Sequence, residues 1–130
     1  MDGIRMTTMK SHKQRGANFE SNIRDYFRSM GYEAERLSRT GKNDEGDVAI
    51  WDSTNGLRYV FECKAPGEAG RINLSGWSQE AQVERENYAK ARSLGENDLG
   101  PAAVLIKARG KSIQDSYLVF RLGDFFHDKS

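Results

Sequence analysis

The stretch that decides the fold is Leu57-Arg58-Tyr59-Val60-Phe61-Glu62-Cys63-Lys64, in which a run over residues 57–61 that is apolar apart from Arg58 ends in the triplet Glu-Cys-Lys. Alternate residues of a strand point to the same face, so Glu62 and Lys64 lie together on one face of the expected strand. Phe61 and Cys63 point to the other face. Folding alone does not require charged groups gathered in one small volume, so a functional role explains them better.

A second short strand, Val48–Trp51, is expected directly after Asp47. The connecting residues 52–56 contain an Asn-Gly pair, which is typical of a hairpin turn, so the two strands should lie antiparallel and side by side. Asp47 can then face Glu62. Two carboxylates this close repel each other unless a cation or a proton lies between them, and hard oxygen ligands suit Mg²⁺, with Mn²⁺ as a substitute. The pattern predicts a divalent-metal nuclease site in which Lys64 holds a water or a phosphate oxygen.

A purely structural interpretation stays open at this point. Asp47 could be a turn residue, and Glu62 with Lys64 a surface ion pair that contributes at most about 1 kcal/mol. Glu-x-Lys alone is a weak motif. Its combination with Gly46-Asp47 before an apolar strand, with hairpin spacing and with a suitable first helix favours the catalytic interpretation.

Composition places the chain among soluble globular proteins of one domain. It has 130 residues, of which 37% are hydrophobic and 30% charged. No apolar stretch approaches the roughly 20 residues that span a bilayer. We therefore expect a cytoplasmic, intracellular protein that has no membrane partner. A viral origin would be compatible with this expectation. Cys63 is the only cysteine, which excludes an internal disulfide and a Cys/His zinc site.

Positive charge is concentrated at the front of the chain. Residues 1–42 carry nine Lys/Arg against five Asp/Glu, although the net charge of the whole chain is only +1. A polyanion could bind this basic segment and release counterions. A solvated basic tail is the alternative. The candidate nucleic-acid-binding residues are Lys13, Arg15, Arg36, Arg39, Lys42 and, in a later loop, Arg71.

The periodicity of the remaining chain predicts an α/β fold with a mixed central sheet flanked by helices. Residues 1–14 are polar and aperiodic and should form a flexible basic tail, with the nuclease domain over residues 15–130. An amphipathic helix is expected over residues 17–30, closed by Gly31. The run over residues 102–108 is apolar apart from the cation Lys107 near its end, as in a buried strand. The other expected elements are strands at 32–37 and 117–122, a helix at 77–94 and a short helix after residue 123.

Several motifs, taken in order, resemble the Holliday junction resolvases of the archaeal type, within the PD-(D/E)xK nucleases of restriction-endonuclease-like fold. The motifs are Arg15-Gly16 with Phe19-Glu20, then Gly46-Asp47-Val48, then Glu62-Cys63-Lys64. The resemblance covers roughly residues 13–110 and also takes in the expected second helix and the apolar strand that follows it. It implies a restriction-endonuclease-like fold.

The resemblance also implies roles for individual residues. Asp47, Glu62 and the main-chain carbonyl of Cys63 would bind the metal, and Lys64 would position the attacking water. Glu20 would complete the acidic site, directly or through a second ion. Two further sets remain open: Thr40 or Ser38 as a contact to the scissile phosphate, and Gln79 or Gln82 near the catalytic lysine.

The function that the resemblance implies is Mg²⁺-dependent, structure-selective cleavage of four-way DNA junctions, without a small-molecule substrate. Two symmetric cuts require a homodimer, and the apolar residues Leu74, Trp77, Phe120 and Phe125 are interface candidates unless they belong to the core. Two alternatives stay open. One is a nuclease of the same superfamily that acts on a flap, a single strand or a duplex. The other is a nucleic-acid-binding module with a decayed site, against which the presence of all four catalytic candidates argues.

Overall fold

A five-stranded mixed sheet forms the centre of the protein in the computed structural model, which describes residues 2–37, 46–67 and 70–127, with side chains from residue 14 onward. The strands lie in the order in which they occur along the chain; β3 and β4 are parallel, and every other neighbouring pair is antiparallel. This confirms the predicted α/β class and the mixed sheet. The strands are β1 (Glu33–Arg36), β2 (Val48–Trp51), β3 (Arg58–Lys64), β4 (Ala103–Ile106) and β5 (Tyr117–Val119).

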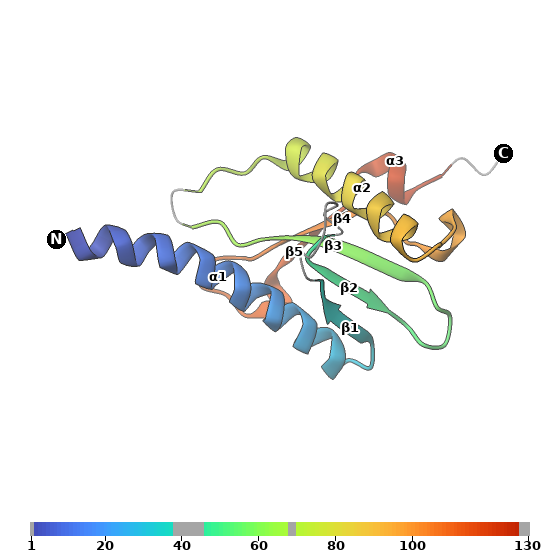
Figure 1. The fold of residues 1–130 in the computed structure, drawn as a ribbon, viewed down its shortest axis with the longest axis horizontal. Helices are drawn as coiled ribbons and strands as arrows, with labels where there is room; N and C mark the ends of the chain where they lie inside the picture. The colour runs from blue at the N-terminus through green and yellow to red at the C-terminus, as the bar shows by residue number, and fades with distance from the viewer. Residues whose placement is uncertain (1, 38–45, 68–69, 128–130) are drawn as a thin grey trace.

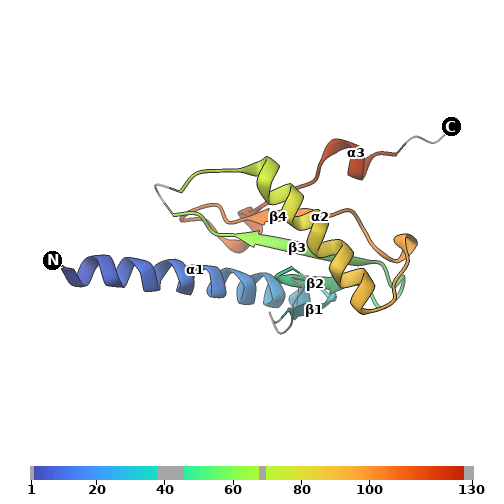
Figure 2. The ribbon, with the colours of Figure 1, turned by 45° about the horizontal axis from the view of Figure 1, so that its top comes forward.

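Two long helices, α1 (Asp2–Ser29) and α2 (Leu74–Ala91), cover opposite faces of this sheet (Figures 1 and 2). Phe19 and Ile23 of α1 pack against one face, and Ala81 and Tyr88 of α2 belong to the clusters on the other. None of the described helices is both long and apolar enough to cross a membrane. The short elements are the 3₁₀ turns η1 (Glu96–Asp98) and η2 (Ile113–Asp115) and the helix α3 (Leu122–Phe125).

Helix α1 begins far earlier than the sequence pattern predicted. The amphipathic part is as expected, with Phe19 and Ile23 buried, but the helix reaches back to Asp2 where an irregular tail was predicted. The segment before Arg15 contains no proline and several good helix formers. Its first turns extend beyond the sheet (Figure 1). The sequence of this segment has no apolar stripe, so periodicity could not reveal the helix.

The β2–β3 hairpin has the predicted antiparallel pairing. Gly56 has a φ of 71° and donates to the carbonyl of Asp52 at 2.7 Å, while the Asp52 side chain accepts from the Thr54 backbone at 2.9 Å. Val48 pairs with Phe61 in the ladder. Continuing this register by one residue places Asp47 opposite Glu62, at the end of the hairpin.

Candidate metal centre

Backbone and side-chain hydrogen bonds fix Asp47 at the start of β2. Its N–H donates to the carbonyl of Phe61 at 3.0 Å, and its own carbonyl accepts from Leu37 at 2.8 Å. The carboxylate Oδ2 accepts from the backbone N–H of Cys63 at 2.8 Å. The aspartate is therefore joined to both neighbouring strands, and its carboxylate lies beside the last residues of β3.

Gly46 gives the chain the turn that brings Asp47 into this place. Its φ of 99° lies in the left-handed region, which side chains rarely adopt. A Cβ at this position would lie 2.7 Å from Cγ1 of Val60. Glycine is required here both by the backbone conformation and by the close approach of β3.

Asp47 and Glu62 are both buried, with exposed fractions of 6% and 3%. Burial, followed by the charge of Glu62, raises the pKa of Asp47 to about 8, against the lowering effect of the Cys63 N–H. Atom Oε2 of Glu62 is buried without a hydrogen-bond partner among the described residues. The pair therefore keeps a proton at neutral pH unless a cation takes its place.

Lys64 lies on the same face of β3 as Glu62, as the strand period predicted. Its Nζ is 3.4 Å from Oε1 of Glu62 and 3.2 Å from Oε2 of Glu80, and it lies 5.5 Å from the centre of the Trp77 ring. Burial acts to lower the pKa of Lys64, but the carboxylates of Glu62 and Glu80 outweigh burial and raise it. The side chain stays an ammonium and does not act as a base.

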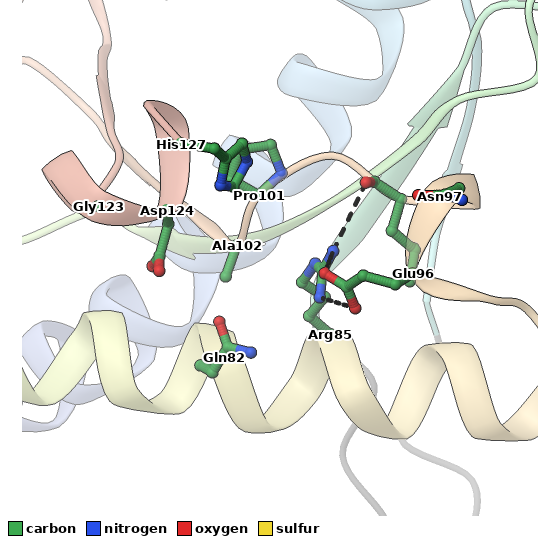
Figure 3. Close-up of a pocket in the computed structure, with 10 residues that line it drawn as sticks. Gln82, Arg85, Glu96, Asn97, Pro101, Ala102, Gly123, Asp124 and His127 are labelled. Atoms are coloured by element: carbon green, nitrogen blue, oxygen red, sulfur yellow. Dashed lines mark hydrogen bonds and ion pairs between the residues drawn. The ribbon is translucent and has the colours of Figure 1, made fainter. Parts of the chain in front are cut away.

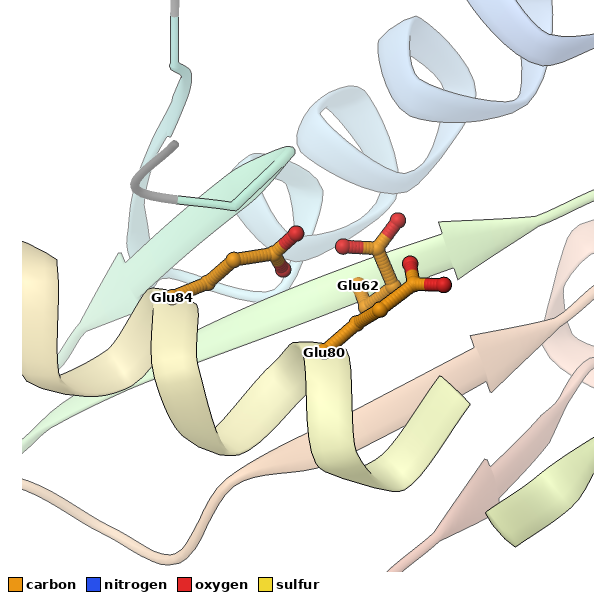
Figure 4. A group of neighbouring side chains, drawn as sticks. All are labelled: Glu62, Glu80 and Glu84. Atoms are coloured by element: carbon orange, nitrogen blue, oxygen red, sulfur yellow. The ribbon is translucent and has the colours of Figure 1, made fainter. Parts of the chain in front are cut away.

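Helix α2 contributes two carboxylates that sequence reasoning missed. One oxygen each of Glu62, Glu80 and Glu84 lies within 4.8 Å of the others, and the three side chains point toward one another (Figure 4). Glu84 is buried together with Ala81 and Tyr88 of the same helix. Positions 77, 81, 84 and 88 form the inward stripe of α2, so an acidic residue within that stripe was the signal that could have identified Glu84.

The two glutamines considered from the sequence lie elsewhere on α2. Gln79 is exposed and lines a cavity together with Val119 and Phe120, while Gln82 donates to Glu86 at 3.3 Å. Neither belongs to the group of three glutamates.

Glu20 approaches the site from α1, on the other side of the sheet from α2. Its charge contributes to the raised pKa of Asp47, which places it within electrostatic range of that carboxylate. Its Oε1 lies 3.8 Å from Nη2 of Arg36, and Nη1 of Arg36 donates to Ser21 at 3.1 Å. Arg36, a candidate for nucleic-acid binding, thus contacts Glu20, a candidate catalytic residue, in this structure.

Cys63 contacts Asp47 through its backbone. Burial raises the pKa of its thiol well above the usual range, and the side chain packs against the core on the α1 side of the sheet. Its N–H faces Asp47, and the N–H and C=O of one strand residue point to the same side. The Cys63 carbonyl therefore lies on the Asp47 side of β3, where the proposed metal ligand is needed.

Basic side chains gather just beyond Lys64. Arg15 of α1, Lys107 and Arg109 line a cavity of about 200 Å³ that also contains Ala65 and Pro66. Lys107 and Arg109 follow the buried strand β4 and were not singled out from the sequence. Arg71 is exposed in the segment before α2. The other predicted contacts fall outside the described side chains; they are Lys13, Ser38, Arg39, Thr40 and Lys42.

A second polar region lies along α2, η1 and α3 and does not include the group of glutamates. Arg85 and Glu96 lie side by side in the lining of a cavity of about 490 Å³ (Figure 3). Arg85 donates to Glu96 at 2.8 and 3.1 Å and to the carbonyl of Gly100 at 2.7 Å. Since these contacts hold chain segments together, we assign this region a structural role.

The donor set at the end of the β2–β3 hairpin fits a hard divalent cation. Asp47, Glu62 and the Cys63 carbonyl offer oxygen atoms only, and one oxygen of Glu62 is buried without a hydrogen-bond partner in the described part of the chain. Carboxylate and carbonyl oxygens are the ligands that Mg²⁺ and Mn²⁺ take in proteins.

Comparisons with known proteins agree with this geometry. The model of the restriction endonuclease family Mrr_cat matches residues 11–76, about half of the chain, which include Glu20, Asp47, Glu62 and Lys64. A comparison with curated proteins finds no match. Among solved structures, Hjc of Archaeoglobus fulgidus, a Holliday junction resolvase from an archaeal hyperthermophile, has a similar fold. The TM-score is 0.54 at 14% identity, over 81% of this chain and 76% of that one. The chain therefore belongs to the restriction endonuclease family of nucleases.

Proposed function

We propose that this nuclease is a metal-dependent, structure-selective DNA endonuclease that hydrolyses phosphodiester bonds in four-way junctions inside the cell. The observation that carries the proposal is the meeting of Asp47, Glu62 and Lys64 at the end of the β2–β3 hairpin. Glu20 lies within electrostatic range of the Asp47 carboxylate. Folding does not need two buried carboxylates in contact, whereas binding a catalytic cation does.

Each residue has a distinct role in the proposed reaction. Asp47, Glu62 and the Cys63 carbonyl would hold Mg²⁺, which supplies Lewis acidity and lowers the pKa of a bound water. Lys64 carries a permanent positive charge 3.4 Å from Glu62, so it can orient the attacking water and stabilise the charge that develops on the phosphate. Glu20 would adjust the charge of the site from the α1 side.

The basic cavity beside the site supports a DNA backbone contact. Arg15, Lys107 and Arg109 lie next to Ala65 and Pro66, the two residues that follow Lys64. A phosphate bound there would be close to the scissile bond, and such contacts position DNA without reading its sequence. Recognition of branched shape needs backbone contacts of this kind.

A homodimer is part of the proposal because a junction needs two symmetric cuts. Of the four apolar candidates named from the sequence, Trp77 and Phe120 pack partly against the core. Leu74 and Phe125 are exposed. Strand β5 is an edge strand, and exposed apolar side chains surround it; this face supports the proposed dimer. Its members are Tyr117, Leu118, Leu122, Phe125 and Phe126.

The test is cleavage of a labelled four-way junction, beside a duplex and a single strand of matching sequence, with Mg²⁺ or EDTA. We expect paired symmetric cuts on the junction alone. Glu62→Gln should reduce the rate about 1000-fold, since a catalytic metal supplies several kcal/mol of transition-state stabilisation. Glu86→Gln, which removes an exposed carboxylate of α2, should leave the rate unchanged. Cleavage of all three substrates would indicate a general nuclease, and binding without cleavage would overturn the enzyme proposal.

A further inference from the structure

We infer that Trp77 and Glu80, two residues of α2, are positioning residues that hold the side chain of Lys64 in place for its role in cleavage. Both lie after residue 76, where the match to the family model ends. The inference deepens the proposed function and rests on it, because Lys64 needs a fixed position only if it acts on the attacking water or the phosphate.

Three groups from two elements contact the ammonium of Lys64. Oε1 of Glu62, on the same strand, lies 3.4 Å from Nζ. Nζ donates to Oε2 of Glu80 at 3.2 Å, and Glu80 extends from α2 toward Glu62 on β3 (Figure 4). The centre of the Trp77 ring lies 5.5 Å from Nζ, within the roughly 6 Å of a cation–π contact. Trp77 and Glu80 are three positions apart, so they share one side of the helix, and α2 supplies two of the three contacts.

A lysine in this role needs such contacts more than most side chains do. Its ammonium is a compact charge on a flexible four-carbon stem, so neither the charge nor the stem fixes its direction. The Lys64 side chain is 24% exposed, which leaves it room to move toward solvent. Misplacing a catalytic group by about 1 Å can reduce a rate about 100-fold. Contacts that restrict the Lys64 ammonium therefore bear directly on the proposed reaction.

Trp77 is itself anchored on its other side. It packs against the buried cluster between α2 and β4, which includes Ala81 and Val104. Its N–H donates to the carbonyl of Asn73 at 2.9 Å, and Asn73 is the N-cap of the helix. The start of α2 is thus fixed, and the indole ring gives Lys64 a surface that belongs to the core.

Glu80 becomes the main acidic partner of Lys64 once Glu62 binds a cation. In the proposed reaction the charge of Glu62 is used by the metal, so its hold on Lys64 weakens, whereas Glu80 keeps its contact. The Glu80 side chain is 51% exposed, and a carboxylate at this edge would by itself repel a DNA phosphate. The two effects of Glu80 can be separated, because positioning acts on kcat and repulsion acts on KM.

The first test measures kcat and KM for junction cleavage separately. Glu80→Ala should lower kcat about 10- to 100-fold and leave KM nearly unchanged. Glu80→Gln, which keeps an acceptor for the ammonium, should recover part of the loss. Glu86→Ala removes another exposed carboxylate from the same helix and should keep both constants. A lower KM with unchanged kcat in Glu80→Ala would mean that Glu80 only repels DNA, and the inference would be overturned.

Trp77→Phe and Trp77→Leu form a matched pair, since both reduce the size of the side chain and only phenylalanine keeps an aromatic face for Lys64. Trp77→Phe should keep most of kcat, and Trp77→Leu should lose about tenfold. Equal losses in the two variants would show that Trp77 acts through packing alone. If circular dichroism shows that Trp77→Leu does not fold, the exposed position Glu80 decides the question.

The second test needs no DNA and follows the mobility of Lys64 by NMR, through order parameters of the lysine Cε–H groups in the presence of Mg²⁺. In the wild type Lys64 should be more ordered than the exposed Lys90. In Glu80→Ala and Trp77→Leu the order of Lys64 should approach that of Lys90. A wild-type Lys64 as mobile as Lys90 would overturn the inference.

The two tests separate this inference from the proposed function. Loss of Lys64 order in both variants of a protein that cleaves no DNA would overturn the nuclease proposal and leave the positioning contacts in place. Junction cleavage with the wild-type kcat in Glu80→Ala and Trp77→Leu would overturn the positioning role and leave the nuclease proposal in place.

Discussion

Glu84 and Arg85 are neighbours on α2, and both are more than nine-tenths buried, yet their surroundings are opposite. Arg85 donates to Glu96 through both Nη atoms and to the carbonyl of Gly100 through Nε. Glu84 lies with its carboxylate oxygen within 4.8 Å of those of Glu62 and Glu80. One helix thus carries a guanidinium that joins chain segments beside a carboxylate that lies near two other carboxylates.

The difference is the one expected between a charge that holds chain segments together and a charge in a candidate metal site. A buried ion with complementary partners fixes segments relative to each other, and here Arg85 holds the η1 region against α2. A buried carboxylate among carboxylates lowers the stability of the metal-free fold, and such arrangements are typical of sites that bind a cation or move a proton. The two residues should therefore respond in opposite ways to removal of their charge.

Loss of the Arg85 charge should have the largest effect on stability. Arg85→Met leaves the buried Gly100 carbonyl without its donor and removes the ion pair with the exposed Glu96, so the free energy of unfolding should fall by about 1–3 kcal/mol. Glu84→Gln, one residue away, should leave the metal-free protein equally or more stable, because it reduces repulsion. Urea denaturation in EDTA measures both variants.

Glu96→Gln serves as the control for the Arg85 variant. The Glu96 side chain is 80% exposed, so its loss should affect stability far less than loss of the buried guanidinium. If Glu84→Gln destabilises the protein as much as Arg85→Met does, Glu84 is a structural residue and the contrast between the two regions is lost.

The stability of the metal-free protein should depend on pH through Asp47. Its pKa is raised from 3.8 to about 8, so the folded protein keeps a proton that the unfolded chain loses. Protonated Asp47 therefore stabilises the folded protein fully below about pH 4. This stabilisation, of a few kcal/mol at most, is lost as the pH rises through about 8. Unfolding by urea at several pH values in EDTA should show this decline, and Asp47→Asn should flatten it.

Mn²⁺ should reverse the trend, because the cation replaces the shared proton and binds more tightly as the pH rises. A wild-type profile that matches Asp47→Asn in EDTA would show that the proton is not held by this pair. The Arg85 region should respond in the opposite sense, because the hydrogen bond from Arg85 lowers the pKa of Glu96 and its contribution to stability is lost as the pH falls.

Much of the β2–β3 part of the site could be predicted from the sequence because local rules determine it. The Asn55-Gly56 turn fixed the register, and the period of two placed Glu62 and Lys64 on one face. The restriction-endonuclease-like fold followed from the motifs that contain these residues. Each of these inferences involves residues close in the chain or a pattern with one common solution.

The two glutamates that α2 brings to the site could not be predicted from the sequence in the same way. Glu80 and Glu84 reach Glu62 only because the helix crosses the sheet at a particular angle, which depends on the packing of Ala81 and Tyr88 rather than on any local pattern. The first turns of α1 escaped prediction for a different reason, since their sequence shows no apolar period.

Alanine substitutions at Gly46 and Gly100, each of which adds one methyl group, test the comparison between the glutamate region and the Arg85 region. A Cβ at Gly46 would lie 2.7 Å from Cγ1 of Val60, on a backbone with a φ of 99°, beside Glu84. A Cβ at Gly100, whose carbonyl accepts from Arg85, would lie 2.2 Å from the Tyr59 ring. Each alanine variant should lose about 1–2 kcal/mol of stability, through strain at Gly46 and overpacking at Gly100.

Their effects on cation binding should differ even though their stabilities are similar. Gly46→Ala shifts the backbone of Asp47, so it should weaken Mn²⁺ binding about tenfold or more, as loss of an orienting contact does. Gly100→Ala disturbs the Arg85 region alone and should bind Mn²⁺ with the wild-type affinity wherever it is folded. Calorimetry at a temperature where both variants are folded makes the comparison. Equal weakening in the two variants would mean that the two sides of α2 are coupled, and that the Arg85 contacts also hold the glutamates in place.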